Sequence, residues 1–96
     1  MLWCMLYCMR IIIHPHARTH GLANKQIIEA YETGSNGAII RYRDRTAEPP
    51  RWATIGFDSD GHEIELVFVK LENNAILIIH ANRLTKGFLQ EIRDAI

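Results

Sequence analysis

A histidine closes an apolar run of the chain and is followed by two cations. His80 comes directly after Ala75–Ile79, where a buried strand would be expected to continue with an aliphatic residue. Arg83 and Lys86 follow within six residues. A neutral imidazole can take the proton of a ribose 2′-hydroxyl, and nearby cations stabilise the charge of the phosphorane that forms. This grouping indicates RNA cleavage, although a histidine at the edge of a hydrophobic core would give the same pattern.

Three histidines near the N-terminus form a second candidate group. His14, His16 and His20 are spaced as in some metal clusters, and the last two would share one face of a helix. Pro15 breaks the geometry between the first two, and no carboxylate stands nearby. We therefore predict neither a metal nor another cofactor. A structural, capping or catalytic role stays open for these residues, and a metal-binding module made of the three histidines is a further alternative. His62, after a turn, is expected to be merely exposed.

The arginines of the middle of the chain form a candidate phosphate-binding patch. Arg41 and Arg43 are two residues apart in a segment with strand character, so they would project from the same face. Arg45 and Arg51 lie close by in the sequence, and together these side chains could hold RNA phosphates. A solvated strand face, or ion pairs with acidic residues elsewhere in the chain, would give the same pattern.

Opposite charges balance in the 96-residue chain, with 11 Lys and Arg against 11 Asp and Glu. A net charge of zero excludes the strongly basic class of nucleic-acid-binding domains. The charges are unevenly spread, because residues 10–51 carry +3, residues 58–72 carry −4 and residues 73–96 carry +1. An RNA site is therefore expected on the basic segment 10–51. The acidic segment 58–72, which contains a predicted hairpin turn, is expected to face away from the RNA.

The elements that must position these side chains follow from periodicity and turn residues. The pattern predicts a small α+β domain in which an antiparallel meander packs with N-terminal helices and a C-terminal helix. A Gly21 stop, an Asn24 cap and a Thr85 cap mark the helix ends. The expected elements are a strand over Arg10–His14, a helical turn over His16–Gly21, a helix over Asn24–Gly34, strands over Ala38–Asp44, Arg51–Phe57, Glu63–Leu71 and Ala75–Ala81, and a helix over Thr85–Ile96.

The first residues differ in character from the rest. Residues 1–8 are apolar and precede a natural strand start at Met9, so we expect a non-native or loosely ordered extension followed by a single domain over residues 9–96. Cys4 and Cys8 lack the further ligands of a zinc site and are read as reduced thiols of a cytoplasmic protein. The apolar stretch is too short to span a membrane, and no membrane association is expected.

Several segments together resemble the BrnT family of type II toxins. Members carry an Arg-Trp-x-x-Ile-Gly strand, a glycine turn, a hydrophobic strand and a strand end like Ile-Ile-Ser-Ala-Arg-x-Ala-Thr. The matching segments here are Pro50–Gly56, Asp60-Gly61, Glu63–Val69 and Ile78–Thr85, and His20-Gly21 resembles the family's Lys-His-Gly. The likeness covers residues 10–93. The departures are Thr19, Pro50, His80 and Asn82, where the family has lysine, often an acidic residue, serine and arginine.

The resemblance implies a RelE-like fold and a ribonuclease that stops translation. It also implies neutralisation by an antitoxin that binds operator DNA. The matching polar positions are His20, Arg51 and Arg83. We therefore expect a metal-independent endoribonuclease in which His80 or His20 is the acid or base and Arg51 and Arg83 hold the phosphate.

Arg41, Arg43 and Lys86 are expected to assist in binding the RNA. A toxin-like module of the same fold that binds a small antitoxin without cleaving RNA stays open as the alternative. Either protein could form a homo- or hetero-oligomer.

Overall fold

A computed structural model describes residues 10–35, 39–41, 47–72 and 74–95. The expected N-terminal extension and the two cysteines lie outside the described residues, as do Arg43 and Arg45. Within these ranges the chain forms an α+β domain, as its periodicity predicts. None of the helices in this part of the chain is long and apolar enough to cross a membrane.

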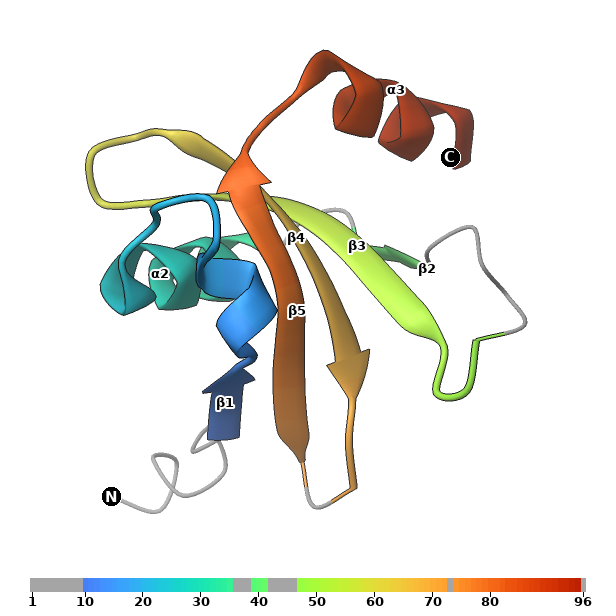
Figure 1. The fold of residues 1–96 in the computed structure, drawn as a ribbon. Coiled ribbons are helices and arrows are strands. Elements are labelled where there is room, and N and C mark those ends of the chain that lie inside the picture. Colours follow the sequence, from blue (N-terminus) through green and yellow to red (C-terminus); the bar gives the residue numbers. More distant parts are fainter. Residues whose placement is uncertain (1–9, 36–38, 42–46, 73, 96) are drawn as a thin grey trace.

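Five strands form one mixed sheet in the order β1-β5-β4-β3-β2 (Figure 1). The three pairs β2–β3, β3–β4 and β4–β5 are antiparallel, and β1 is parallel to β5. In chain order the elements are β1 (Arg10–Ile13), η1 (Pro15–Arg18), α2 (Asn24–Gly34), β2 (Ile39–Arg41), β3 (Arg51–Phe57), β4 (Glu63–Lys70), β5 (Ala75–Arg83) and α3 (Lys86–Ala95).

The parallel edge corrects the expectation of an antiparallel sheet. β1 lies along β5 with Arg10 opposite Ala75 and Ile13 opposite Ile78. Since β4 occupies the other edge of β5, β5 lies inside the sheet with β1 as the edge strand. The local pattern of β1 correctly indicates a strand, but it carries no information about which distant strand it will join.

Alternation along the strands builds a core on each face of the sheet. Leu66 and Phe68 of β4 pack with Ile27 of α2, whereas Val67, between them, packs with Phe88 of α3. This is the two-residue period of a strand buried on both faces. The two helices therefore cover different faces, and Figure 1 shows α3 lying beyond the end of β5, apart from α2.

The helix α2 approaches β3 closely at a glycine. A Cβ atom added to Gly56 would collide with the backbone carbonyl of Ala30 in α2.

The start of helix α2 differs from the predicted asparagine cap, because Asn24 is already its first residue. The Gln26 side chain instead accepts a hydrogen bond from the Ala23 amide at 2.9 Å. Asn24 accepts one from Nε of Arg18 at 3.0 Å.

The turn between β3 and β4 is organised by a buried carboxylate. Asp58 accepts hydrogen bonds from the amides of Asp60 and His62, from the Gln26 side chain and from the His62 ring. Burial alone would raise the pKa of Asp58, but these hydrogen bonds outweigh it and hold the pKa well below its usual value. Gly61 completes the turn with a φ of +83°, which glycine adopts without strain.

Candidate functional site

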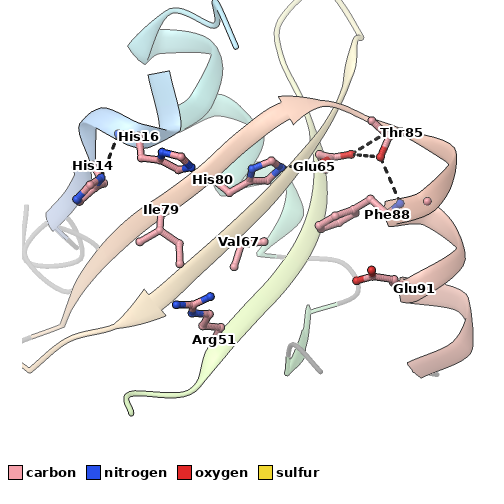
Figure 2. A pocket seen from close by; sticks show the side chains of 11 residues that line it. His14, His16, Arg51, Glu65, Val67, Ile79, His80, Thr85, Phe88 and Glu91 are labelled. Carbon is pink, nitrogen blue, oxygen red and sulfur yellow. Dashed lines mark hydrogen bonds and ion pairs between the residues drawn. The ribbon is translucent and has the colours of Figure 1, made fainter. Parts of the chain in front are cut away.

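A pocket of about 630 Å³ lies on the face of the sheet that α3 covers (Figure 2). Its apolar part includes Val67, Ile79 and Phe88. Its charged and titratable lining residues come from β3, β4, β5, α3 and η1, and from the residue that precedes η1. They are His14, His16, Arg51, Glu65, His80 and Glu91.

Glu65 is a nearly buried carboxylate at the side of this pocket. Its strand neighbours Ile64 and Leu66 belong to the core under α2, so strand alternation turns Glu65 toward α3. Its side chain is only 5% exposed. Oε2 lies 2.7 Å from Nε2 of His80, and Oε1 accepts hydrogen bonds from the Thr85 amide at 2.8 Å and hydroxyl at 2.7 Å. Both carboxylate oxygens are therefore held in place.

His80 reaches the pocket through an irregularity in β5. Ile78 pairs with Phe68 and His80 pairs with Val67, which leaves Ile79 as an extra residue in β5. Such a bulge interrupts strict alternation, and here both Ile79 and His80 line the pocket. The sequence places a histidine at the end of the apolar run, and the bulge determines the face from which it projects.

The Glu65 contact sets the tautomer of the neutral His80 ring. An ionised carboxylate only accepts hydrogen bonds, so Nε2 of His80 carries the hydrogen in this pair. Nδ1 then holds the lone pair that can take up a proton. The side chain of His80 is 29% exposed, so a ligand in the pocket can reach it. Figure 2 shows the ring and the carboxylate pointing toward one another.

Thr85 joins the site to helix α3. Its hydroxyl donates to Glu65 and accepts a hydrogen bond from the amide of Phe88 at 3.3 Å, and its carbonyl accepts from the amide of Leu89. These are the contacts of a helix N-cap. The predicted Thr85 cap is confirmed, and the same hydroxyl also fixes the carboxylate beside His80.

The N-terminal histidines come to the same region as His80. His14 and His16 line the pocket, and Nδ1 of His14 accepts a hydrogen bond from the amide of His16 at 3.0 Å. His20 lies edge-on to His80 with the ring centroids 5.4 Å apart. The fold thus gathers four of the five histidines of the chain around the part of β5 that contains Ile78 and His80.

The fifth histidine lies in the β3–β4 turn. The His62 ring is 42% exposed and pairs with Asp58 at 3.0 Å, so it is not merely a solvated side chain. One ligand atom each from Asp58, Asp60 and His62 lies within 4.8 Å of the others. The hydrogen bonds described for Asp58 account for this arrangement without an ion.

The predicted basic residues separate in the structure. Arg51 lines the pocket from β3. Arg83 lies opposite Ile64, whose side chain packs under α2, so alternation directs Arg83 to the other face of the sheet from His80. Lys86 is exposed at the first residue of α3 and does not line the pocket. The predicted grouping of His80 with these two cations therefore does not form in the pocket.

The remaining RNA-binding predictions stay open. The backbone of Arg41 is in β2, opposite Trp52, and Arg43 is outside the described residues.

Comparison with known proteins yields no match. No protein-family model, no curated protein and no solved structure matches the chain.

Sequence reasoning missed Glu65, the side chain that orients His80. The sequence groups Glu65 with the acidic residues of segment 58–72, which is expected to face away from RNA. A usable signal was present, because Glu65 is the one charged residue in the otherwise apolar stretch Ile64–Val69. A charge inside a strand buried on both faces needs a partner, and His80 and Thr85 supply it.

Proposed function

We propose that this protein is a metal-independent endoribonuclease resembling the BrnT toxins, with His80 as its general base. The observation that carries the proposal is the 2.7 Å contact between His80 and the buried Glu65. A carboxylate that holds an imidazole in one tautomer is a recurring arrangement for acid–base catalysis. The pocket beside it contains Arg51, which is suited to hold a phosphate.

The cleavage step uses the ribose 2′-hydroxyl as the nucleophile. Nδ1 of His80 takes the hydroxyl proton while the 2′-oxygen bonds to the adjacent phosphorus. The bond from phosphorus to the 5′-oxygen breaks, and that oxygen takes a proton from a protonated His20, whose ring contacts that of His80 although His20 does not itself line the pocket. The products are a 2′,3′-cyclic phosphate and a 5′-hydroxyl. Arg51 stabilises the negative charge on the phosphorane oxygens.

The biological setting follows the resemblance. We propose a RelE-like toxin of a type II toxin–antitoxin system, in which RNA cleavage inhibits translation and a small DNA-binding antitoxin neutralises it. The segments that resemble BrnT supply β3, β4 and β5, and these strands carry Arg51, Glu65 and His80. His80, the proposed base, stands at one of the departures, where the family has serine, and His20 precedes these strands.

The second candidate is a toxin-like module that binds the antitoxin without cleaving RNA. Two observations favour it. Arg83, a matching position of the family, lies on the opposite face from His80, and the carboxylates Glu65 and Glu91 both line the pocket. A pocket with these charges attracts RNA weakly when its histidines are neutral.

Incubation of the purified protein with RNA in EDTA separates the two candidates. The nuclease is expected to cleave RNA to fragments with 2′,3′-cyclic phosphate ends, and to leave a 2′-O-methyl RNA of the same sequence intact. RNA that persists as long as in a mock-purified control contradicts the nuclease proposal. A tight complex with the product of a neighbouring reading frame, without growth arrest on induction, supports the binding module.

A further inference from the structure

The charge of the pocket depends on its histidines. Among the described residues that line it, Arg51 is the sole permanent cation, against the carboxylates of Glu65 and Glu91. With neutral histidines the lining has a formal charge of −1, which repels a phosphate. Histidine is the residue type that changes charge between about pH 5 and 8. Protonation of two of the three lining histidines makes the pocket positive.

The groups around the pocket show which histidine controls its affinity for an anion. A protonated His80 pairs with Glu65 at 2.7 Å, so these two charges largely cancel. His20 contacts the His80 ring, and Lys86 does not line the pocket. The balance that remains is between Arg51 from β3 and Glu91 from α3. A proton on the exposed His16 makes the net charge of these remaining groups positive, which favours the binding of an anion.

His14 contributes in a different way from His16. Its Nδ1 accepts the His16 amide hydrogen, so a neutral His14 ring carries its own hydrogen on Nε2. This ring can donate a hydrogen bond to a phosphate oxygen without gaining a charge. His16 follows directly and is exposed, so it can add the charge. The pair places a neutral donor and a titratable donor at the same wall of the pocket (Figure 2).

We propose that His14 and His16 form, with Arg51, a phosphate-binding subsite that holds an RNA strand when His16 is protonated. The identity of the strand as RNA rests on the proposed function, whereas the binding of a phosphodiester does not depend on cleavage. The subsite takes up the strand more tightly as the pH falls. Cleavage, by contrast, requires a neutral His80.

The test measures binding of a fluorescent 2′-O-methyl RNA oligonucleotide by anisotropy, since this ligand cannot react through its 2′-oxygen. At a fixed ionic strength of about 0.1 M, the wild type is expected to bind about tenfold more tightly at about pH 5.5 than at about pH 7.5. His16→Gln should show a smaller pH dependence than the wild type, and the part that remains is assigned to a protonated His80 that neutralises Glu65. His14→Asn, which keeps an acceptor for the His16 amide, should weaken binding at both pH values.

The matched control is His62→Gln. It removes one imidazole in the β3–β4 turn, so it changes the global charge as His16→Gln does while the pocket stays intact. This variant should keep the wild-type pH dependence. Glu91→Gln should bind more tightly at both pH values. Unfolding curves of each variant show that the fold is retained.

Two outcomes overturn the proposal. The first is an equal pH dependence for His16→Gln and His62→Gln, which would show that His16 does not carry the effect. The second is competition by inorganic phosphate as effective as that by the oligonucleotide, which would assign the pocket to a small phosphate. Failure of the nuclease proposal is seen separately, as an absence of cleavage of ordinary RNA by a protein that still binds the 2′-O-methyl oligonucleotide.

Discussion

The His80 ring and the Glu65 carboxylate, 15 residues apart in the chain, meet at 2.7 Å. β4 and β5 are adjacent antiparallel strands, and the bulge between them leaves His80 opposite Val67, two residues along from Glu65 on the same face. The carboxylate is almost fully buried, while the ring remains accessible from the pocket. Glu65 can therefore hold the hydrogen of the His80 ring on Nε2, while Nδ1 of the same ring exchanges a proton with a ligand in the pocket.

Glu65→Gln is expected to lower kcat for RNA cleavage by about 10² to 10³, with little change in KM. A glutamine can still accept from Thr85, but its amide would donate to Nε2 of His80 and so favour the tautomer with the hydrogen on Nδ1. That ring can no longer act as the base. Single-turnover and steady-state assays measure the effect. The control is Glu63→Gln on the same strand, which is exposed and should behave like the wild type.

Arg51→Ala and Arg83→Ala should differ, although both arginines match the family pattern. Arg51 lines the pocket, so its loss is expected to lower kcat/KM by about tenfold to a hundredfold. Arg83 lies on the other face of the sheet, so its loss should change kcat/KM by less than about twofold. Equal losses in the two variants would contradict the placement of the phosphate in this pocket.

How far the sequence predicts this molecule is shown by particular residues. The strands, the C-terminal helix and its Thr85 cap follow from local signals, since alternation and capping act between neighbours in the chain. His80 stands out because it interrupts an apolar run. Closeness in sequence groups Arg83 with His80, whereas strand alternation places the two side chains on opposite faces of the sheet. Nearness in sequence is a poor guide to a shared face in a strand.

Other features depend on contacts between distant segments. The parallel pairing of β1 with β5 joins residues 65 positions apart, and no local pattern encodes it. The bulge at Ile79 shifts the pairing between β4 and the part of β5 that contains His80. The role of Glu65 follows only once Thr85 and His80 are known to lie beside it. These features are tertiary contacts, and the local propensity of a single segment does not predict them.

Gly56→Ala should destabilise the fold strongly. The new methyl group would collide with the carbonyl of Ala30, which is backbone and cannot rotate away, so α2 would have to move off β3. We expect a loss of about 3 kcal/mol in the free energy of unfolding, measured in urea. Gly87→Ala is the matched control, because nothing lies within 4 Å of its added Cβ. In helix α3 that change should stabilise the protein by about 0.5 kcal/mol.

Asp58 makes the free energy of unfolding depend on pH in the acid range. Its hydrogen bonds lower its pKa in the folded protein, so the unfolded chain binds its proton first as the pH falls. The stabilisation is fully present above the unfolded pKa of about 4 and is lost as the pH falls from there toward the lower folded value. Asp58→Asn should show a smaller loss of unfolding free energy than the wild type between about pH 5 and pH 2. Identical pH profiles would exclude Asp58 as a source of acid sensitivity.

The most direct measurement is the cleavage of one RNA oligonucleotide in EDTA by three proteins purified in parallel: the wild type, His80→Asn and His62→Asn. The two variants each lose one imidazole that pairs with a carboxylate, but only His80 lies in the pocket. The wild type and His62→Asn should release fragments with 2′,3′-cyclic phosphate ends, and His80→Asn should be slower by at least about 10². Equal cleavage by His80→Asn, or none by the wild type, would contradict the role of His80 as the base.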